Sequence, residues 1–272
     1  MQQKRMAIVA FGMILGLLPC RPASADQRIY AQTLPASVWI LNKQGNEVSS
    51  GSGAVISLRY RHVITNYHVV GESEEVIIVF PTTYPNGRLI VDRSVYLKHL
   101  QELKRSGRLV IGRVAARNPR TDLALIQLPS IPRGVRALPL AMQSPTPGAK
   151  IYSVGNPGAS DALFVYSHGE VRSVYTKSYS PKDHPCEIHA RVIETDSATN
   201  PGDSGGPVVN ERGELVAIVE SHNRNARLFN TCIHVDEIKR LVHQYMSGQA
   251  SRFGVHPQNL EVVPSYDCFP AL

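Results

Sequence analysis

The most informative stretch of this sequence is Thr195-Asp196-Ser197-Ala198-Thr199-Asn200-Pro201-Gly202-Asp203-Ser204-Gly205-Gly206-Pro207-Val208-Val209, a glycine-rich loop between two strand-like runs. A serine hydroxyl is a weak nucleophile, and it needs a base to take its proton and backbone donors to hold a developing oxyanion. Gly202 can adopt backbone angles that point its N–H into a cleft, while Gly205 and Gly206 let a substrate chain approach closely. The alternative is a polar hairpin turn, because Gly, Pro, Asn and Asp are common in turns.

A histidine and an aspartate occur in informative contexts upstream of this loop. His68 lies where the β-rich run 61–70 turns polar, and Asp122 is the single carboxylate at the start of the apolar run 123–128. The chain order His68, Asp122, Ser204 is one of the three orders known for a Ser-His-Asp triad. These three residues are therefore candidates for a catalytic triad.

Three motifs in this order resemble the trypsin-like serine endopeptidases, and more closely the bacterial HtrA/DegP type without its PDZ domains: Thr65-Asn66-Tyr67-His68-Val69-Val70, Thr121-Asp122-Leu123-Ala124-Leu125 and Asn200-Pro201-Gly202-Asp203-Ser204-Gly205-Gly206-Pro207. The resemblance covers about residues 37–246. It implies peptide-bond hydrolysis through an acyl-enzyme on Ser204, with His68 as the base and Asp122 orienting the imidazole. The N–H groups of Gly202 and Ser204 would form the oxyanion hole. Asp203 departs from the Asn that is common at this place in the HtrA type.

The resemblance also indicates a primary substrate pocket. Ala198, six residues before Ser204, would lie at its base, and Glu220, Ser221 and His222 would form one wall. No negative charge stands at the base, so a preference for Lys or Arg is not expected. Small or medium apolar side chains are expected at the cleaved position, and His222 leaves a preference for acidic side chains open.

Residues 1–25 have the pattern of a secretory signal peptide. Lys4 and Arg5 precede an apolar run, 6–18, that is short for a membrane span, and Ala23-Ser24-Ala25 provides a small-x-small cleavage site. A mature chain would begin at Asp26, with an N-terminal extension over 26–36. The alternative is an uncleaved membrane anchor. The pattern predicts an exported protein, periplasmic or secreted, with no stable membrane insertion after cleavage.

Charge and composition narrow the ligands and cofactors that this chain is expected to bind. Of the formal charge of +7, three positive charges belong to the predicted signal, and no basic cluster alternates with stacking aromatic residues, so nucleic-acid binding is not expected. The mature chain would keep three cysteines, whose disulfide pairing is open: Cys186, Cys232 and Cys268. His184 and His189 flank Cys186 in what reads as a solvated loop. No zinc-ligand spacing occurs, so neither a metal nor a cofactor is expected.

From residue 37 onward the sequence reads as about a dozen short strands separated by turn residues, which is typical of an all-β sandwich or barrel. The predicted strands are 37–41, 53–58, 62–65, 75–80, 109–115, 123–128, 151–154, 169–175, 190–195, 207–209, 215–219 and 231–235. The resemblance implies two six-stranded antiparallel barrels, about 37–128 and 149–235. The Pro- and Arg-rich segment 129–148 would connect them.

Two segments interrupt the β pattern. Residues 92–106 have apolar side chains near helical spacing and predict a helical insertion in the first barrel, of unknown role. Residues 236–245 predict an amphipathic C-terminal helix of the 37–246 protease domain, capped by Asp236. Only the 247–272 tail follows, which is too short for a PDZ module, and the oligomeric state is open.

The sequence therefore predicts an exported serine endopeptidase that acts on proteins or peptides. Two alternatives remain: a catalytically silent trypsin-fold binding protein, and a protein quality-control factor. Intact triad residue types and the glycine frame favour the first interpretation.

Overall fold

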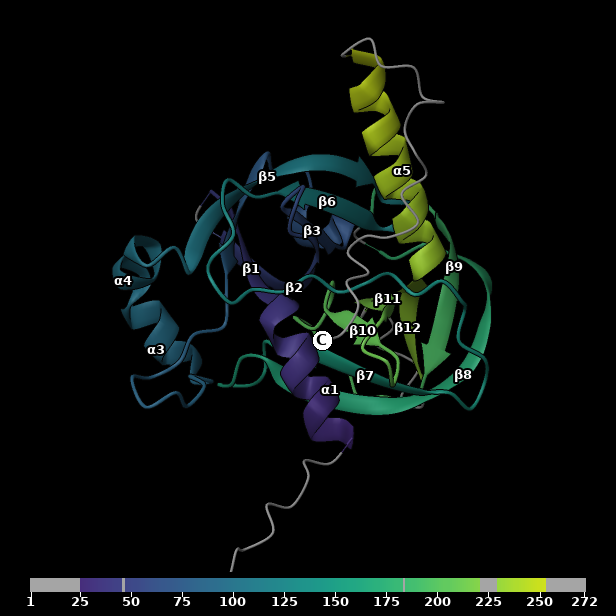
Figure 1. The fold of residues 1–272 in the computed structure, drawn as a ribbon. Coiled ribbons are helices and arrows are strands. Elements are labelled where there is room, and N and C mark those ends of the chain that lie inside the picture. The colour runs from purple at the N-terminus through teal and green to yellow at the C-terminus, as the bar shows by residue number, and fades with distance from the viewer. Residues whose placement is uncertain (1–24, 46, 183, 221–228, 253–272) are drawn as a thin grey trace, which may run out of the picture.

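A computed structural model describes residues 25–45, 47–182, 184–220 and 229–252 of the 272-residue chain. Within these ranges, the strands form two closed six-stranded barrels, in the orders β1-β2-β3-β6-β5-β4 and β10-β11-β12-β9-β8-β7 (Figure 1). Neighbouring strands run antiparallel throughout both barrels. The predicted all-β double barrel is confirmed.

The first barrel is built from β1 Ser37–Gln44, β2 Glu47–Ser57, β3 His62–Thr65, β4 Glu75–Val79, β5 Leu109–Asn118 and β6 Leu123–Gln127. The second is built from β7 Lys150–Gly155, β8 Val165–Tyr179, β9 Ile188–Thr195, β10 Pro207–Val209, β11 Leu215–Glu220 and β12 Asn230–His234. Each strand overlaps a predicted one. The largest difference is β8, which is longer than predicted because much of it is exposed and polar, so it lacks a clear apolar pattern.

Apolar side chains from the strands fill the barrels, as their sequence pattern requires. One large buried cluster includes Ile64 and Leu125 of the first barrel and Val192 and Ile218 of the second. Burying such side chains stabilises the fold by about 25 cal/mol per Å² of apolar surface removed from water. The cluster therefore holds the two barrels to each other and fixes the loops between them.

Helices decorate the barrels: α1 Ala25–Thr33, α2 Tyr67–Val70, α3 Arg93–Lys98, α4 Leu100–Arg105 and α5 Val235–Arg252, with 3₁₀ turns η1 Leu34–Ala36 and η2 Pro119–Thr121. The predicted insertion is confirmed as the pair α3 and α4. Asp92 is the N-cap of its first helix, and its carboxylate accepts the Ser94 N–H at 2.8 Å. None of the helices in the described ranges has the length and apolar content needed to span a membrane.

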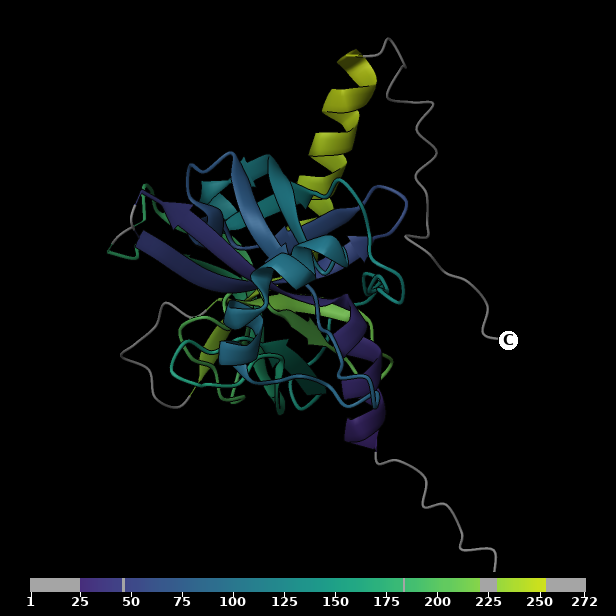
Figure 2. The same ribbon diagram turned by 90° about the vertical axis from the view of Figure 1, so that its left-hand side faces the viewer.

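The C-terminal helix α5 is longer than predicted and packs against strands of both barrels, β5 and β6 as well as β9, β11 and β12. Ile238, Leu241 and Val242 are its buried contacts. Asp236 lies in the first turn rather than at the cap, and its N–H donates to His234 Nδ1 at 3.1 Å. In Figure 2 the last turns of α5 project beyond the barrels.

Helix α1 lies against the second barrel in the region predicted only as an extension. It packs on β7, with Ile29 buried and the Tyr30 hydroxyl donating to the Phe164 carbonyl at 3.0 Å. The predicted signal peptide lies outside the described residues, apart from Ala25 at the start of α1.

Candidate active site

His68 and Asp122 lie at the same edge of the first barrel. Strands β3 and β6 pair with Thr65 opposite Ala124, so the residues just after β3 and just before β6 come together. His68 belongs to α2, which follows β3 directly, and Asp122 stands between η2 and β6. The register of this one strand pair therefore places the two side chains within reach of each other.

Asp122 has an unusual backbone conformation, with φ 51° and ψ 44°. This left-handed region is uncommon for residues other than glycine, although Asp tolerates it better than most. Two hydrogen bonds hold it there: the Asn66 side-chain amide donates to the Asp122 carbonyl at 2.9 Å, and the Asp122 N–H donates to the Pro119 carbonyl at 3.1 Å. Such conformations persist where the surroundings fix them, often at functional sites.

The Asp122 carboxylate binds His68 at two points. Oδ1 accepts the backbone N–H of His68 at 2.9 Å, and Oδ2 lies 2.8 Å from its Nδ1. Asp122 is fully buried, whereas the His68 side chain is 20% exposed. Burial alone would raise the pKa of Asp122, but the charge and hydrogen bonds of His68, together with His184, hold that pKa well below its usual range. Asp122 is therefore ionised and fixes the orientation of the imidazole.

Ser204 is buried in the β9–β10 loop. Ser52 of β2, in the first barrel, holds this loop through two hydrogen bonds. The Ser52 N–H donates to the Ser204 carbonyl at 2.8 Å, and the Ser52 hydroxyl donates to the Gly202 carbonyl at 2.8 Å. Next to Ser204, a Cβ on Gly205 would lie 2.2 Å from both the Ser52 carbonyl and Thr65 Oγ1. Glycine is required there because the loop packs directly against the strands that lead to His68.

The peptides before Gly202 and Ser204 are fixed by their carbonyl groups. The Pro201 carbonyl accepts the Gly158 N–H at 2.7 Å, and the Asp203 carbonyl accepts the Gly206 N–H at 2.9 Å. The N–H and C=O of a trans peptide point in opposite directions. The Gly202 and Ser204 N–H groups therefore point away from these partners, and each has one defined direction.

Asp203 turns into the protein rather than toward solvent. Its Oδ2 accepts the Asn200 N–H at 2.8 Å, and its side chain packs so closely on β7 that a Cβ on Gly155 would lie 2.2 Å from Oδ1. Burial raises the pKa of Asp203 to about 6, and the hydrogen bond from the Asn200 N–H opposes this increase. A carboxyl group beside Ser204 thus titrates in a range where this residue type is normally fully ionised.

Comparisons with known proteins identify the family to which this fold belongs. The model of the trypsin-like peptidase domain matches residues 51–218, more than half of the chain. The chain belongs to the trypsin-like peptidase family. Its fold is similar to that of the Rv3671c protease from M. tuberculosis in the active form, with a TM-score of 0.62, 21% identity, and coverage of 87% of this chain and 93% of that one.

Two relatives of this trypsin-like chain carry names of the HtrA group. It is 29% identical to a periplasmic serine endoprotease DegP-like of Pseudomonas putida over 65% of this chain, and 27% identical to the serine protease HhoA of Synechocystis over 82% of this chain. The matches span 30% and 50% of those proteins. The resemblance to HtrA-type proteases is confirmed, and the chain spans half or less of the length of these relatives.

The predicted primary pocket of this trypsin-like domain is only partly described. Ala198 is exposed on the β9–β10 loop, and its carbonyl accepts the Ser167 hydroxyl at 2.9 Å. Glu220 is buried at the end of β11. Ser221 and His222 lie outside the described residues, so the pocket assignment stays a prediction.

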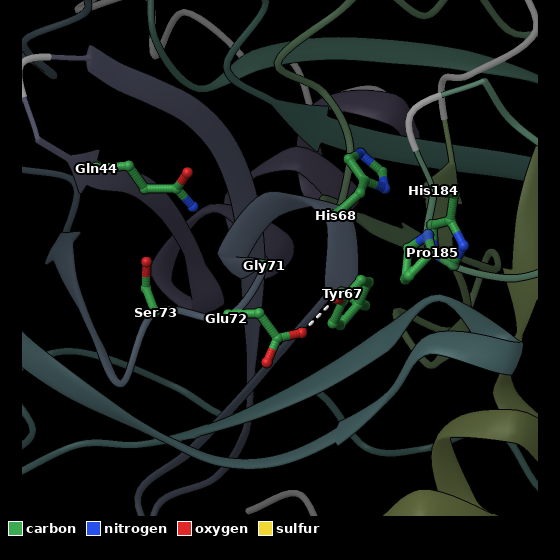
Figure 3. Close-up of a pocket in the computed structure, with 8 residues that line it drawn as sticks. All are labelled: Gln44, Tyr67, His68, Gly71, Glu72, Ser73, His184 and Pro185. Carbon is green, nitrogen blue, oxygen red and sulfur yellow. Dashed lines mark hydrogen bonds between the residues drawn. The ribbon is translucent and has the colours of Figure 1, made fainter.

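A different pocket, of about 410 Å³, opens beside His68. Figure 3 shows His184 and Pro185 on one side of it, Gln44 and Ser73 on the other, and Tyr67 between them, with its hydroxyl bonded to Glu72. That hydrogen bond is 2.5 Å long, and it is the main cause that raises the pKa of Tyr67 to about 12. The Tyr67 hydroxyl is therefore neutral and fixed near His68.

Several residues around the site had not been predicted. Ser52 and Asn156 share a buried contact of 3.0 Å between the barrels, and Asn66 supports Asp122. His184 was read as part of a solvated loop. The segment is exposed at Pro185, Glu187 and His189, but the His184 side chain itself is 1% exposed. Only the Asn in the quoted Thr-Asn-Tyr-His motif had a sequence signal. Across the described part of the chain, no group of three or more His, Cys, Asp and Glu residues is arranged to hold a metal ion.

Proposed function

We propose that this chain is an exported serine endopeptidase, with Ser204 as the nucleophile, His68 as the general base and Asp122 as the orienting carboxylate. The observation that carries the proposal is the two-point contact between Asp122 and His68. A carboxylate only accepts hydrogen bonds, so Nδ1 of His68 carries the proton and donates to Oδ2. The lone pair of the imidazole is then on Nε2, which is the atom that must accept a proton from serine.

The reaction proceeds in two balanced halves. Ser204 Oγ attacks the carbonyl carbon of the peptide bond while its proton passes to His68 Nε2, and the carbonyl oxygen becomes an oxyanion. Collapse breaks the C–N bond, and His68 returns the proton to the leaving amine. Water then attacks the acyl-enzyme in the same way, with His68 taking its proton and delivering it to Ser204.

The Gly202 and Ser204 N–H groups are the donors for the oxyanion in this proposal. Support comes from the fixed directions of the two peptides and from φ 102° at Gly202, which only glycine adopts easily. A Cβ on Gly202 would also lie 2.6 Å from the Asn156 carbonyl. Removing one such donor in a serine protease costs about 10²–10³ in kcat.

Export and substrate class complete the proposal. The signal-like segment 1–25 and a relative named as periplasmic support an exported protein that cleaves proteins or peptides. A primary pocket with Ala198 at its base would prefer small or medium apolar side chains over Lys or Arg. A cleavage profile on a diverse peptide mixture tests this preference, and dominant cleavage after Lys or Arg would reject it.

Labelling by a fluorophosphonate tests the nucleophile. The full chain, expressed with its N-terminus intact, should be labelled on Ser204 and should be recovered outside the cytoplasm with Asp26 as its first residue. Ser204→Ala should lose the label and lower casein hydrolysis by about 10⁶, the loss typical of serine proteases.

The matched control is Ser178→Ala, because Ser178 also contacts a histidine, His189 Nδ1 at 2.8 Å, but on the surface of the second barrel. This variant should keep label and activity. Absence of labelling in a folded wild-type chain would favour a silent binding protein, and labelling that survives Ser204→Ala would reject the nucleophile.

A further inference from the structure

His184 comes from the β8–β9 loop of the second barrel and meets the aspartate of the first. Its Nε2 lies 3.7 Å from Asp122 Oδ1, while His68 occupies Oδ2. Its ring also stands edge-on to Tyr67, with ring centroids 5.4 Å apart and an interplanar angle of 72°. The Asp122 carboxylate therefore lies between two imidazoles, one from each barrel.

One hydrogen bond and one close charged contact define the protonation of His184: Nδ1 is hydrogen-bonded, whereas Nε2 has no hydrogen-bond partner among the described residues and lies near the Asp122 carboxylate. Its Nδ1 is 2.8 Å from the Cys186 carbonyl oxygen, which can only accept, so Nδ1 carries a proton. A neutral ring would then direct the lone pair of Nε2 at the Asp122 carboxylate, a repulsive contact. A second proton, on Nε2, converts this contact into an ion pair. The arrangement favours the doubly protonated imidazolium.

The titratable groups near His184 also favour its positively charged form. The contact with Asp122 is the main cause that raises the pKa of His184; burial opposes it, and the buried Glu220 of β11 adds to the increase. Tyr67 of α2 is neutral, as described above. Tyr179 of β8 lies close to both carboxylates, and its pKa is raised by burial and by Glu220 and Asp122 in turn, so it too is neutral. Burial raises the pKa of Asp122, and the two histidines that face it, His68 and His184, lower it.

We propose that His184 is a positioning residue. As an imidazolium, it holds Asp122 in place and partly compensates the effect of the negative Asp122 carboxylate on His68. This inference rests on the proposed peptidase function, because it concerns the same triad, although His184 takes no part in bond making. With part of its charge compensated, Asp122 stabilises the protonated form of His68 less strongly. His68 then remains an available base at lower pH than it would without His184.

The sign of the effect follows directly. His184→Gln keeps a side-chain donor but removes the positive charge, so Asp122 favours protonated His68 more strongly. The acid limb of kcat/KM should therefore move to higher pH, by on the order of one pH unit or somewhat less, as expected for a unit charge removed at this range in a protein. The contact with Asp122 raises the pKa of His184 above the usual 6.5, which favours its charged form as the pH falls.

The test compares pH profiles of kcat/KM for the wild type, His184→Gln and the control His189→Gln, all normalised to the fraction labelled by fluorophosphonate. His189 is exposed and contacts Ser178 instead of Asp122, so its variant should keep the wild-type midpoint. A purely structural role for His184 would lower the melting temperature and the active fraction without moving the midpoint. That result would overturn the inference.

A measurement independent of turnover keeps the inference testable if His184→Gln does not fold. ¹⁵N NMR of histidine-labelled Ser204→Ala protein at pH 6 should show both ring nitrogens of His184 protonated. A neutral His184 ring at that pH would also overturn it. A wild-type chain that is folded but neither labelled nor active would instead reject the proposed function, so the two failures are distinguishable.

Discussion

Single side chains at this site carry more than one constraint, and Asp203 is the clearest case. It forms the turn before Ser204 by accepting the Asn200 N–H, but it does so from a position where burial raises its pKa to about 6. The unfolded chain releases this proton near pH 4. Between those two values the folded state binds more protons, so stability falls as pH rises, and the cost is complete above about pH 6.

Asp203→Asn should therefore stabilise the protein at pH 8, by at most about 3 kcal/mol for a shift of about two pKa units, and by almost nothing at pH 4. The Asn amide oxygen can still accept the Asn200 N–H. Both versions would be compared in a Ser204→Ala background to prevent self-cleavage, using thermal unfolding at a series of pH values. A stability difference that does not change between pH 4 and pH 8 would contradict this account.

At the level of elements, the helical insertion of the first barrel is connected to the loop that contains Ser204. The Arg93 guanidinium donates to the Pro157 carbonyl at 2.8 Å and lies over Trp39, 5.2 Å from the ring centroid. The next residue, Gly158, donates its N–H to the Pro201 carbonyl, which orients the Gly202 N–H. A side chain at the start of α3 thus supports the peptide proposed to bind the oxyanion.

Arg93→Ala should lower kcat by about tenfold with little change in KM, because one hydrogen bond to a charged group supports a donor used mainly in the transition state. Steady-state kinetics on a peptide substrate, normalised to labelled active sites, measures the split. Arg88→Ala is the control. Arg88 lies over Tyr84 in the same connection between β4 and β5, but it is exposed. An unchanged kcat per active site in Arg93→Ala would show that the insertion only adds stability.

Elements and long-range contacts differ in how far the sequence predicts them. The twelve strands were predictable because β-branched runs and turn residues mark them locally. Helix α1 was not, since only Ile29 and Thr33 of its described side chains are buried. The contacts of His184 with Asp122 and of Arg93 with Pro157 each join residues that are more than 60 positions apart in the sequence. Such pairs are determined by barrel packing, and nothing in the local sequence indicates them.

Across the whole molecule, the candidate site depends on the two barrels staying together. His68 and Asp122 belong to the first barrel and Ser204 to the second, and α5 packs across both. The single tryptophan, Trp39 of β1, is buried in a cluster that also contains Val154 of β7 and Phe164, so it reports on the first barrel and on its packing against the second. Far-UV circular dichroism reports on all strands and helices. If the barrels form one cooperative unit, the two signals change at the same denaturant concentration.

Leu241→Ala should test this coupling, because Leu241 is a buried contact of α5 in the core cluster that spans both barrels. Removing a buried leucine side chain costs about 2–5 kcal/mol, so the tryptophan and circular dichroism midpoints should fall together. Gln244→Ala, on the exposed face of α5, should leave both midpoints unchanged. A variant in which the tryptophan signal keeps its midpoint while circular dichroism shifts would mean that the packing around Trp39, including its contacts with the second barrel, does not depend on α5. In that case the alignment of Ser204 with His68 would depend mainly on the contacts of Ser52 and Asn156 between the barrels.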